Sequence, residues 1–326
     1  MSGIKNRFPV LVLGLILWGG SFQGVTAQSV LELASKSESE VQFLSPIPIR
    51  VSSNLVSVPV SVTDNAGQVI KNLDVLDFRI EEDGSPIPIS KMAEASQSPL
   101  NLALLFDLSG SVKSRFEFEQ QAAIHFLEKV WKPGDTISLI TFNEQPDIRL
   151  RNSTSLEEAL QEISKLDPTP YSTAFFDTVI SAAKLLHQAA GVGTRQAVIV
   201  LSDGADNRSD HTLTEALQEV QGADTIFYSI NPSGASTRLN EVNIRGQANL
   251  VYLATETGGS AFISGNTADL TDIFNRIATE LQAQYLLSYY SLNSSLDGKF
   301  RHIKASIPSR PDLRIRARQG YYATTK

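Results

Sequence analysis

Buried strands alternate with amphipathic helices between residues 98 and 283, and this alternation restricts the fold more than any other feature of the chain. The runs 102–106 (LALLF) and 197–201 (AVIVL) are apolar at every position, which is typical of strands covered on both faces. Between them, apolar residues recur with helical spacing, as in 116–131. The pattern predicts an α/β fold with a doubly wound, mostly parallel sheet and helices on both of its faces.

The remaining elements of this α/β unit are predicted from the same two periodicities. Strands are expected at 136–142, 225–230 and 260–263, and helices at 155–166, 175–190, 212–221, 249–257 and 269–283. No internal repeat or low-complexity tract interrupts their order. We therefore take 98–283 as one domain.

The segments on either side of this domain, 46–97 and 284–326, have the pattern of β-structure. Residues 54–63 alternate Val with Ser or Pro, and 78–82 (FRIEE) is followed by Asp83-Gly84, a hairpin signal that predicts a return strand at 87–89. Strands are also expected at 284–290, 300–307 and 313–322, and no helix is expected in 46–97. The flanking segments predict a small β-sandwich, although the sequence leaves open whether they pair with each other.

The first 27 residues have the pattern of a secretory signal peptide. Lys5 and Arg7 precede an apolar run, 8–18, and the small residues around Ala27 offer a cleavage site before Gln28. A membrane anchor is the alternative, but spanning a bilayer takes about 20 apolar residues and this run is shorter. We expect an exported protein, periplasmic or secreted, with no transmembrane anchor in the mature chain and a polar linker at 28–45.

Charge and cysteine content exclude several classes of function. The formal net charge is −7, so nucleic acid is not an expected partner, because phosphate binding depends on clustered Lys and Arg. Cysteine is absent, which excludes thiolate catalysis, zinc-thiolate sites and a lipidated N-terminal cysteine.

Polar side chains gather where the two fully apolar strands end. Asp107, Ser109 and Ser111 follow the first strand, Asp203 follows the second, and Thr173 lies between them in a loop before a helix. In open α/β sheets, ligands bind at the carboxyl ends of the strands. Two carboxylates and three hydroxyls are oxygen donors of the kind that Mg²⁺ prefers. The set predicts a site for Mg²⁺ (or Mn²⁺) with one coordination position left for a ligand.

Each half of this set also has an ordinary structural interpretation. Asp and Ser are favoured helix caps, and Asp203-Gly204 could be a plain strand-to-helix turn. The order of the residues and their shared position at strand ends favour the metal site over two unrelated turns. Asp206 is interpreted as a solvated loop residue, and Asp177 as an acidic residue favoured by the dipole of its helix.

At these residues the sequence resembles the von Willebrand factor A family, over about 98–283. The resemblance implies that Asp107, Ser109, Ser111, Thr173 and Asp203 form a metal-ion-dependent adhesion site, in which the Ser and Thr hydroxyls touch the ion and the Asp residues act through water. The flanking segments are similar to those of exported bacterial, notably acidobacterial, proteins with a related domain. One departure is that Tyr171 and Ser172 precede Thr173, where the family often has Gly.

Three functions are compatible with such a site. The one we favour is a binding and adhesion module, in which an Asp or Glu carboxylate of a protein partner completes the shell of the ion. A metal-assisted hydrolase is the alternative, but no general base stands at a fixed spacing from the motif, and neither His-Glu-x-x-His nor Gly-x-Ser-x-Gly occurs. A structural protein of the cell envelope is the third. We therefore expect no enzymatic activity and no catalytic residues.

Overall fold

The computed structural model describes residues 55–109, 116–168, 172–191, 193–233, 241–264 and 269–324. All of them belong to one compact unit, Ser52–Lys326. The predicted signal peptide (1–27), the predicted linker (28–45) and the first residues of the N-terminal β segment (46–54) lie outside the described residues, and so does Ser111.

A six-stranded sheet in the order β10-β9-β8-β5-β6-β7 forms the centre of the α/β part. All neighbouring strands run parallel except β7, which is antiparallel to β6. The strands are β5 (Leu100–Asp107), β6 (Thr136–Phe142), β7 (Pro146–Ser153), β8 (Arg195–Leu201), β9 (Thr225–Asn231) and β10 (Ala261–Ile263). Every residue of β5, β8 and β9 is buried, as the continuous apolar runs predict.

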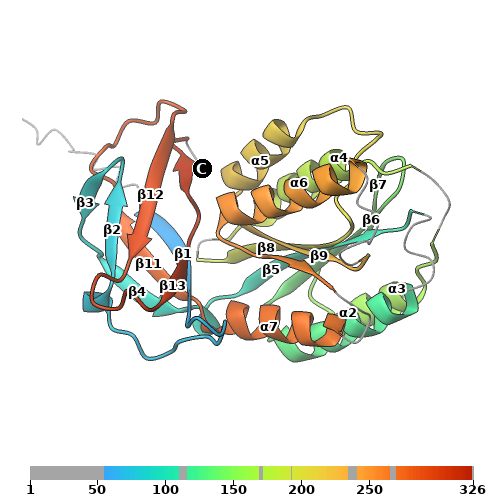
Figure 1. Cartoon of the computed structure of the whole chain (residues 1–326), viewed down its shortest axis with the longest axis horizontal. Helices are drawn as coiled ribbons and strands as arrows, with labels where there is room; N and C mark the ends of the chain where they lie inside the picture. Colours follow the sequence, from blue (N-terminus) through green and yellow to red (C-terminus); the bar gives the residue numbers. More distant parts are fainter. Residues whose placement is uncertain are drawn as a thin grey trace, which may run out of the picture. The chain divides into compact units, whose positions relative to one another are not determined.

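Helices cover both faces of this sheet (Figure 1). Each face has its own apolar core. One face packs against α2 (Phe116–Val130), α3 (Leu156–Ser164) and α7 (Asp269–Ala283). The other packs against α4 (Phe175–Ala189), α5 (Leu213–Gly222) and α6 (Glu241–Thr257). The predicted doubly wound, mostly parallel α/β fold is therefore confirmed.

Two elements of the α/β part differ from the prediction. Strand β7 was not expected, because it alternates apolar residues with Arg149 and Arg151 and begins at a proline, which only an edge strand tolerates. Helix α6 begins at Glu241 and not at residue 249. Its first turns carry Val242 and Ile244 on the exposed side, so they lack the buried apolar stripe from which a helix is predicted.

Two antiparallel sheets form a sandwich from the flanking segments. One has the order β13-β1-β11-β4 and the other β14-β12-β2-β3. The strands are β1 (Leu55–Thr63), β2 (Arg79–Glu82), β3 (Ser85–Ile87), β4 (Lys91–Glu94), β11 (Tyr285–Tyr290), β12 (Phe300–Ser306), β13 (Arg314–Arg316) and β14 (Gly320–Tyr322). β1 pairs with β11 and β2 pairs with β12, so N-terminal and C-terminal segments share both sheets.

The details of the sandwich follow local turn chemistry. Asp83 and Gly84 both have positive φ angles, which is the conformation of a tight hairpin turn between β2 and β3. A short 3-10 helix, η1 (Val75–Asp77), occurs where no helix was expected, and Asp74 caps it. Strand β4 was not predicted, and the expected strand 313–322 is divided into β13 and β14, one in each sheet.

Within the residues that the structure describes, no helix combines the length and the apolar character needed to cross a membrane.

Candidate metal centre

The first residue of the predicted site stands at the topological switch point of the sheet. β5 is the first strand of the sheet in sequence and has β6 on one side and β8 on the other, so the chain adds β6 and β7 on one side of β5 and then β8, β9 and β10 on the other. The register places Asp107 beside Phe142, the last residue of β6, and Phe106 beside Leu201, the last residue of β8. Ligands of open α/β sheets bind where such a reversal leaves a crevice at the carboxyl ends of strands.

Both oxygens of the Asp107 carboxylate are held by hydrogen bonds from two loops. The backbone N–H of Ser109 donates to Oδ1 at 2.9 Å, and the hydroxyl of Ser202 donates to Oδ2 at 2.8 Å. Asp107 is 1% exposed and Ser202 is fully buried. The carboxylate is thus fixed between the end of β5 and the residue that follows β8.

Burial dominates the electrostatics of Asp107. It raises the pKa of this carboxyl group to about 6, although the hydrogen bonds from Ser109 and Ser202 act in the opposite direction. The neighbouring Asp203 carboxylate raises the pKa further by repulsion. A buried carboxyl group therefore has a second, partly exposed acidic residue as its neighbour, and a cation bound near both would relieve their repulsion.

Asp203 is positioned by an unusually close contact between its loop and α6. Its Oδ1 accepts a hydrogen bond from Ala205 N at 3.0 Å, which closes a turn around Gly204. Gly204 has a φ of +75°, and a Cβ there would lie 2.4 Å from the carbonyl oxygen of Gly246 on α6. A Cβ on Gly246 would in turn lie 2.7 Å from Ala205 N. Only glycine at both positions lets the helix approach this turn so closely.

Thr173 is brought to the same edge by backbone contacts from two sides. The Asn207 side chain accepts a hydrogen bond from Thr173 N at 2.9 Å, and Asn207 N donates to Thr173 O at 3.1 Å. Ala174 N donates to the carbonyl of Asn143, the residue after β6, at 2.7 Å. Asn207 follows Asp203 by four residues, so the Thr173 loop is fastened to the loop that carries the second acidic residue. Thr173 itself is buried.

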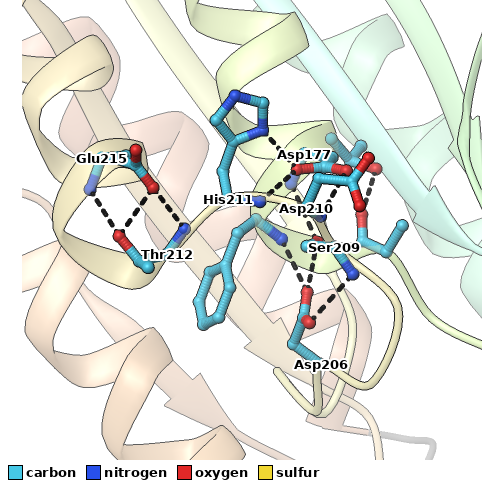
Figure 2. Close-up of polar contacts among 10 residues, drawn as sticks. Asp177, Asp206, Ser209, Asp210, His211, Thr212 and Glu215 are labelled. Carbon is cyan, nitrogen blue, oxygen red and sulfur yellow. Dashed lines mark hydrogen bonds and ion pairs between the residues drawn. The ribbon is translucent and has the colours of Figure 1, made fainter.

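The rest of the loop after β8 is fastened to the first turn of α4 (Figure 2). Asp206 accepts a hydrogen bond from Phe176 N at 3.0 Å, so it caps α4 from a different segment of the chain and is not the solvated loop residue that was expected. Asp177 accepts hydrogen bonds from Asp210 N and His211 N and lies 2.7 Å from Nδ1 of His211. Partial burial acts to raise the pKa of Asp177, but these hydrogen bonds and the His211 ring outweigh it and lower the pKa.

The structure thus collects Asp107, Ser109 and Asp203, and it ties the backbone of Thr173 to the same loops. Ser202, Asn207 and Gly246 support the site and were not assigned to it from sequence. A polar residue directly after the apolar run 197–201 could have identified Ser202, whereas nothing in the sequence points to Gly246. Within the described ranges, no group of three or more His, Cys, Asp or Glu side chains is arranged to hold a metal. The donors available are therefore two carboxylates and hydroxyl groups.

A family comparison matches this part of the chain. The model of the von Willebrand factor type A domain matches residues 101–276, which is more than half of the sequence and includes Asp107, Ser109, Ser111, Thr173 and Asp203. The search of curated proteins gave no match.

Several solved structures are similar to this chain at low sequence identity. Proximal thread matrix protein 1 from the mussel byssus is 14% identical with a TM-score of 0.50, over 62% of this chain and 51% of that protein. A structure of the same mussel protein with zinc in its metal-ion-dependent adhesion motif has a TM-score of 0.49 and 15% identity, over 61% and 49%. A von Willebrand factor type A protein from Catenulispora acidiphila has a TM-score of 0.47 and 16% identity, over 72% and 51%. The chain spans about half the length of each of these proteins.

Proposed function

The chain belongs to the von Willebrand factor type A domain family, and from this premise we propose that it is a protein-binding module that depends on a divalent cation. Asp107, Ser109, Ser111, Thr173 and Asp203 would hold Mg²⁺ or Mn²⁺ at the carboxyl edge of the sheet. When bound, the ion supplies a positive charge and an open coordination position. An Asp or Glu carboxylate of a protein partner would take that position.

One observation carries the proposal, namely the buried Asp107 carboxylate fixed beside a second acidic residue. Burial and the repulsion from Asp203 both raise the pKa of Asp107, which means that they disfavour its ionised form. A role in stabilising the fold therefore does not explain why this carboxyl group is buried beside Asp203. A helix cap or a plain turn would not require an almost inaccessible carboxyl group at the end of a central strand. Oxygen donors of this kind, with two carboxylates and neutral hydroxyls, fit a hard divalent cation. They fit Zn²⁺ less well, because Zn²⁺ prefers nitrogen and sulfur ligands.

We propose that the protein binds its partner without catalysing a reaction. Asp107 is 1% exposed and accepts hydrogen bonds from Ser109 and Ser202, so its carboxylate has little access to a water molecule that could attack a substrate. We expect no hydrolysis of phosphate-ester or peptide substrates with Mg²⁺ or Mn²⁺. Cation-dependent turnover that disappears in Ser109→Ala would instead identify a hydrolase.

We also propose that the protein acts outside the cytoplasm. The support is the charged flank, the short apolar run and the small residues of 1–27. Cell fractionation with mass measurement of the mature protein tests this, and a first residue at Gln28 is expected. A protein found in the cytoplasm with its first 27 residues intact would refute export.

Affinity capture from cell-envelope extract, followed by binding of the purified partner, tests the function. The full chain is immobilised in parallel as wild type, as Ser109→Ala and as Arg208→Ala, an exposed control on the neighbouring loop. A partner retained with Mg²⁺, released by EDTA, lost with Ser109→Ala and kept with Arg208→Ala is the expected result. Binding that is equal in EDTA and in Mg²⁺ would exclude the proposed mechanism.

A further inference from the structure

A groove of about 600 Å³ lies between the second half of α7 and the turn at 64–69 of the sandwich. Its lining includes three arginines from two different parts of the fold. Arg276 lies on α7, and Arg314 and Arg316 lie on β13. None of these residues belongs to the loops that surround Asp107. The groove is therefore a separate surface.

Arg276 stacks on an aromatic ring and forms no ion pair within the described residues. Its Cζ lies 5.1 Å from the centroid of the Phe262 ring, and its Nη2 lies 3.4 Å from the position that a Cβ on Gly67 would take. The guanidinium is thus fixed between an aromatic face and the turn of the sandwich. Stacking on an aromatic ring fixes a guanidinium but leaves its N–H donors free for an anion.

The charges around the groove are unbalanced. Arg316 pairs with Glu280, which is buried, so these two charges neutralise each other. Arg276 and Arg314 are exposed, and neither forms an ion pair within the part of the chain that the structure describes. Asp272 is the other carboxylate on the groove, and it lies one turn before Arg276 without pairing to it. The groove is thus lined by two unpaired guanidinium groups and one unpaired carboxylate. This local excess of positive charge contrasts with the formal net charge of the chain, which is −7.

We propose that this groove is a docking surface for an acidic segment of a partner polypeptide, bound through carboxylates to Arg276 and Arg314. Arg276 and Arg314 would each form an ion pair with a carboxylate of the partner, as Arg316 does with Glu280 in the wall of the groove. A small anion such as phosphate would fill little of 600 Å³. Val69 and Phe262 add apolar side chains to the lining, which suits the side chains of a peptide.

Fluorescence anisotropy with a labelled decaglutamate peptide tests this inference. The full chain is titrated at low salt in EDTA, so that the result does not depend on the proposed metal site. The double variant Arg276→Glu/Arg314→Glu is compared with Lys304→Glu/Lys91→Glu, which changes the charge equally at exposed positions elsewhere on the sandwich. Thermal unfolding of each variant shows that it is folded.

The wild type should bind the peptide, and the double arginine variant should bind at least about ten-fold more weakly, because like charges across an interface repel strongly. The lysine double variant should stay within about two-fold of the wild type, because neither lysine lines the groove. Equal loss in both double variants would overturn the proposal, since it would show unspecific attraction. Absence of wild-type binding, or displacement by inorganic phosphate at concentrations as low as those of unlabelled peptide, would overturn it as well.

Discussion

Asp107 occupies a position at which a parallel sheet normally buries an aliphatic side chain. The preceding residues of β5 from Leu102 to Phe106 are apolar and buried, and the chain then places a carboxyl group at 1% exposure. Hydrogen bonds from Ser109 and Ser202 offset part of the cost of desolvating it, and Asp203 adds to that cost. We therefore expect the ionised residue to lower the stability of the protein when no cation is bound, as residues of functional sites often do.

The variant Asp107→Asn measures this cost. Burial raises the pKa of this carboxyl group to about 6 in the folded protein, whereas its ordinary value is 3.8. A raised pKa contributes stability that is present below about pH 4 and is lost as the pH rises through about 6. In EDTA we expect the variant to be more stable than the wild type at pH 7 by up to about 3 kcal/mol. The advantage should shrink as the pH falls towards 4.

Chemical denaturation at several pH values in EDTA measures the difference between the two proteins. With Mg²⁺ present, only the wild type should gain stability, because the ion binds the folded state. Equal stability of the two proteins at pH 7 in EDTA would contradict the account of Asp107.

Asn207 is predicted to set the affinity for the cation without touching it. Its side chain and its backbone N–H both bind the backbone of Thr173. Asn207→Ala removes the side-chain contact, so the Thr173 loop must be ordered when the ion binds. We expect the Kd for Mg²⁺ measured by calorimetry to rise by roughly ten-fold, equivalent to the loss of about one hydrogen bond. Arg208→Ala, next to it and exposed, should leave the Kd unchanged, and an equal change in both variants would refute this role.

At the scale of elements, the end of α7 is anchored to the sandwich by a buried polar network. Oε1 of Glu280 accepts hydrogen bonds from Ser61 at 2.9 Å and from Tyr228 at 2.8 Å. Its other oxygen pairs with Arg316. Gln284, the residue between α7 and β11, donates to Ser61 and Tyr228 at 3.2 Å. One carboxylate thus connects α7, β9, β1 and β13.

Tyr228→Phe tests how much this network stabilises the fold. The change removes one donor to Glu280 and one acceptor for Gln284 while keeping the ring. We expect the free energy of unfolding to fall by about 1 to 3 kcal/mol, because buried partners are left unsatisfied. Tyr252→Phe on the exposed side of α6 is the matched control and should change it by less than about 0.5 kcal/mol. A neutral Tyr228→Phe would show that the Tyr228 hydroxyl does not help to hold α7.

The periodicity of apolar residues predicts the elements that are buried along their whole length. It does not predict the elements that are partly exposed. β5, β8 and β9 are buried on both faces, so their apolar runs identify them from sequence. β7 lies at the edge and carries charges, and the first half of α6 keeps its apolar residues exposed, so neither has the expected pattern. The pairing of β1 with β11 joins residues more than 220 positions apart and leaves no local signal.

The residues of the candidate site also differ in how well the sequence predicts them. The side chains that we propose as contacts of the ion can be predicted from sequence, because acidic and hydroxyl residues after buried strands are conspicuous. The residues that position them are not, because Asn207 acts through a backbone and Gly246 through the absence of a side chain. Asp206 was misinterpreted because it caps a helix that is distant in sequence.

At the scale of the whole molecule, the amino ends and the carboxyl ends of the strands in the central sheet contact different parts of the protein. β5 enters the sheet at Leu100 directly after the sandwich segment and ends at Asp107. At its start, Arg195 of β8 donates to the carbonyl of Leu281 at 2.8 Å and so links the sheet to the end of α7. The amino ends of the strands therefore join the sandwich, and the carboxyl ends carry the candidate metal centre. A partner at the metal centre and a partner in the arginine groove would not compete for the same residues.

Anomalous diffraction from a crystal grown with Mn²⁺ tests the central claim most directly. We expect one strong anomalous peak at the carboxyl edge of the sheet, bonded to hydroxyl oxygens of Ser109 and Ser111 at about 2.1 to 2.2 Å, with Asp107 and Asp203 bound directly or through one water. The peak should vanish in crystals of Asp203→Ala. A peak at another place, or none at this edge with Mn²⁺ in excess, would contradict the account.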